Sequence, residues 1–317
     1  MNRLCKILNI RFPIIQGGMG NISNAPLTAA ISEAGALGTF GVGTRTPEEV
    51  EPILQQIKRT TTKPFAVNIP ISVTKYGKEW IDLVSKYSVP VVSLSAGNPA
   101  NFIPYLKERG IKVMTVVGTV KHGLKAMEAG TDIVVGEGFE AAGINSPYEI
   151  TTMALIPQLR NSLSIPIIAA GGIGDGRGLA AALTLGADGV QLGTRFIVAK
   201  EAPFSKRYKE KIIQANDQAT VIVGRSVGKI RRLLHTPYAQ QLLTEEQNGM
   251  DEETYFRKTT ELVHWRGAME GDVENGLMNS GQIAGLVYAE QTAEEIIDSL
   301  IQEAKQAITE LYKSYIV

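Results

Sequence analysis

The chain has 317 residues, of which 44% are hydrophobic and 20% are charged, as is typical of a packed globular protein. Lysine and arginine together number 32, as do aspartate and glutamate, so no basic excess points to a nucleic acid or an anionic membrane as partner. The one cysteine, Cys5, allows no intrachain disulfide and no cysteine-based metal site, which fits a reducing, cytoplasmic compartment.

Eight short apolar stretches alternate with helical patterns along the chain, and most of them end in Gly, Ser, Asn or Thr. Near-continuous apolar runs are typical of strands covered on both faces of a parallel sheet. The predicted strands are residues 13–19, 37–43, 65–71, 91–97, 112–118, 132–138, 166–172 and 189–196. Eight strand–helix alternations favour an α/β fold of the (β/α)8 or TIM barrel type, with an open doubly wound sheet as the alternative.

Start and stop signals predict helices between these strands. The alanine-rich pattern Ala25–Ala34 is followed by glycine, which is typical of a helix end. Thr46 precedes a proline and two glutamates, which together predict a capped helix start, and Asn98 precedes a proline in the same way. Tyr148–Leu163 is the sixth predicted helix.

The alternation breaks after the eighth predicted strand, because the next long amphipathic pattern is Ala293–Tyr315. We interpret this pattern as the eighth barrel helix, so residues 1–198 and 286–317 form the barrel and residues 199–285 are an insertion. The patterns at 208–215, 230–234 and 252–263 predict helices in the insertion. An insertion after strand 8 emerges on the face that carries active sites in such barrels, so we expect a helical lid.

The stretch from residue 166 to residue 194 carries the clearest binding signal. Gly171 and Gly172 follow the seventh predicted strand, and Gly193 and Thr194 follow the apolar part of the eighth. Glycine lets backbone N–H groups approach a ligand, and a helix N-terminus favours an anion. The corresponding loops of TIM barrels frequently hold a phosphate, which we predict here. The alternative is that these glycines only form tight turns.

Six motifs in chain order carry a resemblance to a known family. They read IIQGGM, VNIP, EGFEAAG, AAGGIGDGRG, GVQLGTRF and GDVENGLMNSGQIAGL. With them the chain resembles the nitronate monooxygenase family, which includes the 2-nitropropane dioxygenases and the flavin-dependent enoyl-ACP reductase II. The resemblance implies an oxidoreductase with a lidded TIM barrel, FMN at the C-terminal ends of the strands and a small-molecule substrate. The resemblance is compatible with a homodimer but does not decide the oligomeric state.

The resemblance also implies which residues bind FMN. They are Gly17, Gly18, Met19, Asn68, Glu137, Gly171, Gly172, Ile173, Gln191, Gly193 and Thr194. The first three match a loop that runs along the flavin, and Asn68 matches a polar residue near its ring. A flavin needs an apolar shelf, polar groups for its pyrimidine edge and backbone amides for its phosphate, which this set offers. The alternative for Asn68, Glu137 and Gln191 is a structural or solvated polar group.

One loop departs from the family pattern. The family reads E-A-G-G-H after strand 6, and its histidine is the usual catalytic base or substrate contact, whereas residues 140–145 here read EAAGIN. Ile144 or Asn145 therefore stands at the histidine position. The other histidines are expected at the surface or in the core, and His264 is the one for which a position facing the flavin is considered.

This departure favours a substrate that is already an anion. Removing a proton from a neutral nitroalkane needs a positioned base, typically a factor of ~10²–10⁴ in rate, whereas a nitronate needs only donors for its oxygens. We therefore predict oxidative denitrification of alkyl nitronates, with Asn145 and Tyr148 as catalytic residues on the substrate side. The substrate is expected between residues 141–148 and lid residues 269–282.

Two alternatives stay open. An NADH-dependent enoyl-ACP or enoyl-thioester reductase would need NADH as reductant and a proton from Tyr148 or water. A non-catalytic FMN-binding protein would explain the missing histidine. An inosine-monophosphate dehydrogenase-like barrel is disfavoured because Cys5 precedes the first strand. No hydrolase elbow, P-loop, histidine cluster for a metal, signal peptide or membrane span is recognisable.

Overall fold

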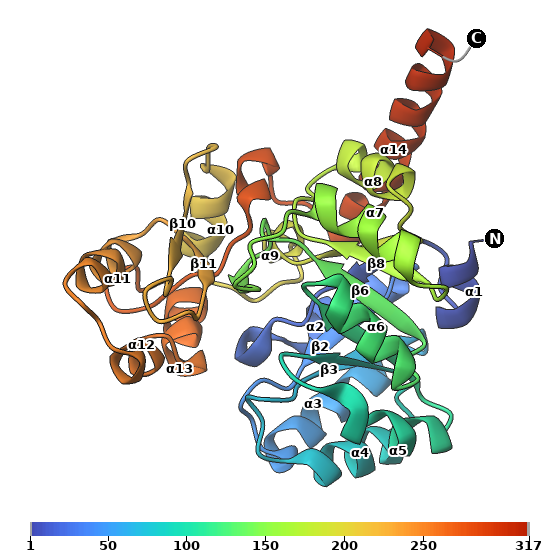
Figure 1. Ribbon diagram of the computed structural model, residues 1–317, viewed down its shortest axis with the longest axis horizontal. Coiled ribbons are helices and arrows are strands. Elements are labelled where there is room, and N and C mark those ends of the chain that lie inside the picture. Colours follow the sequence, from blue (N-terminus) through green and yellow to red (C-terminus); the bar gives the residue numbers. More distant parts are fainter. Residues whose placement is uncertain (1, 316–317) are drawn as a thin grey trace.

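All eight stretches predicted as strands contain a strand in the computed structural model, which describes residues 2–315 (Figure 1). The barrel strands are β1 (Ile14–Gln16), β2 (Gly38–Gly41), β3 (Phe65–Pro70), β4 (Val91–Ser95), β5 (Lys112–Val117), β6 (Ile133–Glu137), β8 (Ile167–Ala170) and β9 (Gly189–Leu192). Each strand is shorter than its predicted range, and most strands lose polar or glycine residues at the C-terminal end.

The strands form a parallel sheet in the order β1-β9-β8-β6-β5-β4-β3-β2. A parallel bridge between Ile15 and Leu37 joins its two ends, and the N–H of Leu37 donates to the carbonyl of Ile14 at 3.0 Å. The ring therefore closes next to β2, which confirms the TIM barrel and excludes the open doubly wound sheet.

Helices surround this barrel. They are α2 (Ala25–Glu33), α3 (Pro47–Thr60), α4 (Gly77–Lys86), α5 (Ile103–Glu108), α6 (Val120–Glu128), α7 (Thr152–Ser162), α8 (Gly176–Thr184) and α14 (Ala293–Tyr315). The predicted start of α3 is confirmed by a capping box, in which the N–H of Thr46 donates to Glu49 Oε2 at 2.7 Å.

Two helix predictions need correction. Asn98 starts a short 3-10 turn (Pro99–Asn101), and α5 begins only at Ile103. The sixth predicted helix begins at Thr152 instead of Tyr148, because the preceding residues form an extended loop with Glu149 at a positive φ of 50°.

An additional helix, α1 (Arg3–Leu8), lies before the barrel and was not predicted. Its residues Leu4, Cys5 and Leu8 are buried in one cluster with side chains of the barrel interior. A cap supports its start, since Asn2 Oδ1 accepts from the N–H of Leu4 at 2.7 Å.

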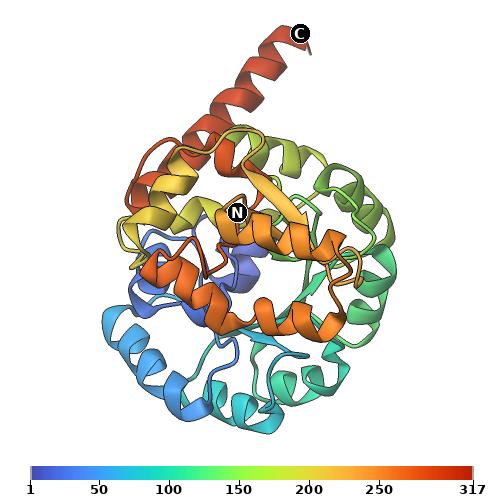
Figure 2. The ribbon, with the colours of Figure 1, turned by 90° about the vertical axis from the view of Figure 1, so that its left-hand side faces the viewer.

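The insertion lies across one end of the barrel (Figure 2). Its elements are α10 (Lys206–Ile213), β10 (Thr220–Val223), β11 (Arg231–Leu234), α11 (Pro237–Gln247), α12 (Glu252–Lys258), α13 (Glu261–Trp265) and a π-helical turn (Arg266–Glu270). A last 3-10 turn (Gln282–Leu286) returns the chain to the barrel. We call the segment 199–285 the lid. Its separation from the barrel as a unit of its own remains a prediction.

The lid is not purely helical, so the prediction of a helix at residues 230–234 is wrong. This stretch contains β11, which pairs antiparallel with β10 and with β7 (Gly143–Ile144). A helix needs several turns to be stable, whereas this short segment finds hydrogen-bond partners on both sides. The predicted helix at residues 252–263 is likewise interrupted, because Thr260 caps the new helix α13.

The last helix, α14, has the predicted bounds and packs on α8 through Ile296, Ile297, Leu300 and Ala304. Its C-terminal half projects from the body of the molecule in both views (Figures 1 and 2). Among residues 2–315, no helix has both the length and the apolar character of a membrane span.

Candidate active site

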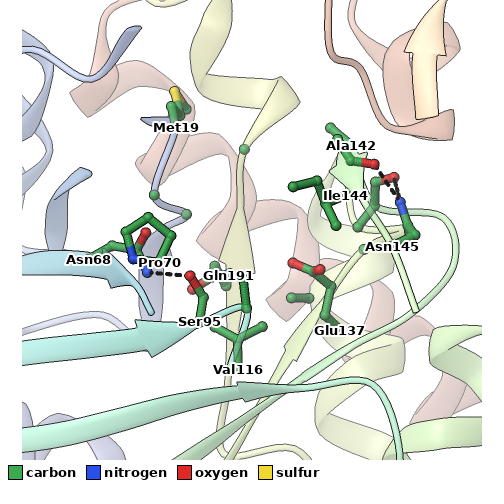
Figure 3. A pocket seen from close by; sticks show the side chains of 18 of the residues that line it. Met19, Asn68, Pro70, Ser95, Val116, Glu137, Ala142, Ile144, Asn145 and Gln191 are labelled. Atoms are coloured by element: carbon green, nitrogen blue, oxygen red, sulfur yellow. Dashed lines mark hydrogen bonds between the residues drawn. The ribbon is translucent and has the colours of Figure 1, made fainter. Parts of the chain in front are cut away.

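A cavity of about 680 Å³ lies at the C-terminal ends of the strands, between the barrel and the lid (Figure 3). Every residue predicted to bind FMN lines this cavity, and so does Asn145. Tyr148 does not line it. The position agrees with the rule that active sites of TIM barrels lie at this face.

Two glycine turns form one side of the cavity. Gly171 and Gly172 have positive φ angles of 89° and 73°, so a side chain at either position would be strained. A Cβ built on Gly193 would meet nothing within 4 Å. Among residues 2–315, the N–H groups of Gly172, Ile173 and Gly193 donate to no backbone carbonyl. Free amides beside open space are suited to an oxyanion such as a phosphate.

Two carboxylates of the protein itself bind N–H groups at the N-terminus of α8. Asp175 accepts from the N–H of Gly178 at 3.1 Å, and Glu303 of α14 accepts from the N–H of Gly176 at 2.8 Å. Both carboxylates already occupy the positive end of this helix. The amides of the two glycine turns therefore remain as the donors without a partner near this helix end.

Glu140 and Thr152 support the first turn from behind. Glu140 Oε2 accepts from the N–H of Thr152 at 2.9 Å and from its hydroxyl at 3.1 Å. The hydroxyl of Thr152 also lies 2.9 Å from the carbonyl of Gly171. This network joins the loops after β6 and β8 and so fixes the glycine turn.

The chain after β1, which pairs with β9, forms the adjoining side of the cavity. A Cβ on Gly18 would lie 2.5 Å from Asn68 Oδ1, so only glycine allows this close approach. Asn68 Nδ2 donates to Ser95 Oγ at 3.1 Å and to the carbonyl of Ser93 at 3.2 Å (Figure 3). The loop thus lies flat against β3 and presents Met19 to the cavity, as a planar ring requires.

Side chains from two other segments hold this loop in place. Arg45 donates from Nη1 to the carbonyl of Gly20 at 3.3 Å and from Nη2 to that of Ser23 at 3.2 Å. Burial lowers the pKa of Arg45. From the lid, Glu261 Oε2 accepts from the N–H of Asn21 at 2.8 Å. The loop is therefore tied to both the barrel and the lid.

Glu137 lies at the end of β6 and lines the cavity (Figure 3). Burial raises the pKa of its carboxyl to about 7. At neutral pH this group is therefore divided between its protonated and its ionised form, so that it can donate or accept a hydrogen bond.

Of the two catalytic residues predicted in the loop after β6, Asn145 lines the cavity and Tyr148 does not. Asn145 Nδ2 donates to the carbonyls of Ala141 and Gly143, both at 3.0 Å, so both amide hydrogens hold the loop and none is free for a substrate. Tyr148 is 66% exposed and lies outside the cavity. Ile144, the other residue considered for the histidine position, lines the cavity with its apolar side chain.

The loop and lid residues 269–282, between which the substrate is expected, both line the cavity and also contact each other. The N–H of Gln282 donates to the carbonyl of Glu140 at 3.0 Å, and β7 pairs with β11 of the lid. The two segments are thus hydrogen-bonded to each other and form one wall.

This wall adds polar groups that the sequence analysis missed. Tyr208, Arg231, Glu261, His264 and Asn279 all line the cavity. Of these five residues, only His264 was considered for the site from the sequence. A signal that could have indicated Arg231 is the arginine pair within the apolar stretch IRRLL. Tyr208 donates its hydroxyl to the carbonyl of Asn279, and burial raises the pKa of Tyr208.

The residues present fit FMN. Unpaired amides at the two glycine turns suit its phosphate, the flat loop after β1 suits its ring, and Asn68, Glu137 and Gln191 offer polar groups nearby. Among residues 2–315, no group of three or more His, Cys, Asp or Glu side chains is arranged to hold a metal ion.

The chain is similar to proteins of known families over nearly its full length. The family model described as nitronate monooxygenase matches residues 1–80 and 71–303. A probable nitronate monooxygenase of Staphylococcus saprophyticus is 30% identical, with 96% of this chain and 98% of that protein covered. A (3aS,4S,5R,7aS)-5-hydroxy-7a-methyl-1-oxo-octahydro-1H-indene-4-carboxyl-CoA dehydrogenase of Mycobacterium tuberculosis is also 30% identical, over 95% of each chain.

Among solved structures, FabK from Thermotoga maritima is 37% identical and superposes with a TM-score of 0.93 over 99% of each chain. The similarity therefore includes the barrel and the lid.

Proposed function

The chain belongs to the nitronate monooxygenase family and is an oxidoreductase, and from this premise we propose that it binds FMN and oxidises alkyl nitronates. The phosphate would be held by the amides of Gly172, Ile173 and Gly193, and the ring would lie along Gly17–Met19. When bound, FMN supplies an electron acceptor that dioxygen can reoxidise. In the net reaction, two nitronates and one dioxygen give two carbonyl compounds and two nitrite ions.

The proposal depends on the loop after β6, where neither Ile144 nor Asn145 can act as a base. Ile144 cannot accept a proton, and Asn145 spends both amide hydrogens on the loop itself. A neutral nitroalkane must lose a proton before oxidation, whereas a nitronate has already lost it. The loop is therefore better suited to a preformed nitronate.

The test compares nitronates with their neutral parents. FMN-loaded protein is mixed with nitroethane or 2-nitropropane, each either neutral or ionised beforehand, and oxygen uptake and nitrite release are followed without NADH. We expect turnover of the ionised forms and at least ~10-fold slower turnover of the neutral forms. Equal rates on both forms would contradict the proposal.

A single substitution sharpens this test. Ile144→His returns a titratable group to the position that the family uses, and we expect it to raise turnover of neutral nitroethane by ~10-fold or more. Ile144→Leu is the matched control, because it changes shape but adds no base. A similar gain in both variants would show that the effect is steric.

Enoyl-thioester reduction is the second candidate. It is favoured by the 37% identity to FabK over 99% of both chains and by the resemblance to enoyl-ACP reductase II. It requires NADH, so NADH consumption with crotonyl-CoA, in the absence of any nitronate, distinguishes it. A protein that retains FMN but reacts with neither substrate class would instead be a binding protein.

A further inference from the structure

Strand β11 directs one arginine to the cavity and the next one away from it. In the pairing with β7, Arg231 lies opposite Ile144 and Arg232 lies opposite Gly143. Opposed residues of an antiparallel pair have their side chains on the same face, so Arg231 shares a face with Ile144. Both residues line the cavity.

The two arginines differ in their partners. Arg232 Nη2 donates to the carbonyl of Phe139 at 3.0 Å, and its guanidinium lies 4.6 Å from the ring centre of Phe139. Arg231 is only 6% exposed, yet its Nε and Nη1 have no hydrogen-bond partner. Among residues 2–315, Arg231 forms no ion pair with an acidic side chain, and the hydroxyl of Tyr255 lies beside it.

An uncompensated cation in such a place is costly. Burying a charged group without a partner costs several kcal/mol, and a guanidinium stays charged while presenting five N–H donors. A ligand with negatively charged oxygens in the cavity would offset this cost.

The neighbours of Arg231 leave room for such a ligand. His264 is 3% exposed, and burial lowers its pKa to about 4, so the ring is neutral at pH 7. Asn279 Nδ2 lies 3.2 Å from a ring nitrogen of His264. Two carboxylates of this wall, Glu261 and Glu140, already accept hydrogen bonds from the N–H groups of Asn21 and Thr152.

We propose that Arg231, flanked by His264 and Asn279, is the anion-binding residue of this cavity and selects substrates that carry a planar oxyanion. A guanidinium matches the flat geometry of a nitronate or carboxylate group and binds it with charge-assisted hydrogen bonds. The inference rests on the proposed function only in placing the substrate in this cavity. It extends to any anionic substrate of the enzyme.

The first experiment measures binding without turnover. Sodium nitrate and sodium propionate, two planar oxyanions, are titrated into the FMN-loaded full-length protein while the flavin spectrum is followed, with propionamide as the uncharged comparison. We expect both anions to bind and Arg231→Met to weaken this binding about 10- to 100-fold, as the loss of a charged hydrogen bond implies. Unchanged anion binding in Arg231→Met would overturn the inference.

The matched control is Arg225→Met. Arg225 is a lid arginine that is exposed and paired with Glu149 at 2.8 Å, outside the cavity. We expect this variant to bind nitrate as the parent does. If Arg231→Met does not fold, Arg231→Lys keeps the charge, loses the planar fork and should bind nitrate more weakly than the parent. Equal binding by Arg231→Lys and the parent would then count against the inference.

Two nitronates separate the possible sources of the anion. One is the nitronate of 2-nitropropane, and the other also carries a carboxylate, as 3-nitropropionate does after ionisation. A raised KM for both in Arg231→Met assigns Arg231 to the nitronate group, and a raised KM for the second alone assigns it to the carboxylate. Unchanged KM values for both would overturn the inference. Because nitrate binding needs no turnover, a protein that oxidises no nitronate can still pass the first experiment.

Discussion

The barrel wall and the lid wall of the cavity are built in different ways. The barrel wall uses glycine turns and backbone amides, with Gly171, Gly172 and Gly193 at the ends of neighbouring strands. The lid wall uses long polar side chains, above all Arg231 and His264, which come from separate elements. The difference fits the two proposals made above, in which the barrel would hold the cofactor and the lid would select the substrate.

The largest expected effect concerns Glu137 of the barrel wall. Its folded pKa of about 7 exceeds the ordinary value of 4.5, so the folded protein binds this proton more tightly than the unfolded chain does. The contribution of Glu137 to the free energy of unfolding is therefore largest below pH 4.5, falls as the pH rises from 4.5 to about 7, and then levels off. The accumulated loss is roughly 3 kcal/mol at most.

Glu137→Gln should remove this loss, because the amide does not ionise. We expect the FMN-free variant to unfold at a higher temperature than the parent at pH 8, and at a similar temperature at pH 4.5. The exposed Glu108→Gln serves as the control and should leave the pH profile unchanged. Equal melting temperatures of Glu137→Gln and the parent at pH 8 would contradict the assignment.

The next effect tests whether the barrel wall holds the cofactor. A valine at Gly193 meets no protein atom within 4 Å at its Cβ, so Gly193→Val should fold normally while filling the space beside the free amides. We expect FMN to bind ~100-fold more weakly, or about 2.7 kcal/mol. Gly77→Ala, remote from the cavity, is the control. Normal FMN retention by Gly193→Val would contradict the proposed binding of the phosphate at this turn.

The smallest effects concern Asn145 and Tyr148 in the loop after β6. Asn145→Ala removes two hydrogen bonds to Ala141 and Gly143, so we expect a loss of about 1–3 kcal/mol in the free energy of unfolding, measured by denaturant titration. Tyr148→Phe should change neither stability nor turnover, because Tyr148 is exposed outside the cavity. A large loss of turnover in Tyr148→Phe would show that the loop closes over the substrate.

Local sequence signals determined the barrel and its glycine turns. The apolar runs at residues 13–19 and 166–172 predict covered strands without knowledge of their neighbours, and Gly171 and Gly172 mark a turn that other residues would strain. The bounds of α14 followed from its amphipathic period in the same way. In each case a residue and its near neighbours in the chain contain the physical cause.

Tertiary structure alone decided the lid wall. Residues 230–234 became a strand because β10 and β7 offer edges on both sides, and Arg231 faces the cavity because of its register with Ile144. His264 and Asn279 meet only after the lid has folded. Likewise, Glu303 accepts a hydrogen bond from the N–H of Gly176 at the start of α8, although the two residues are 127 positions apart in the chain. Contacts of this kind depend on which surfaces come together, which no local pattern in the chain records.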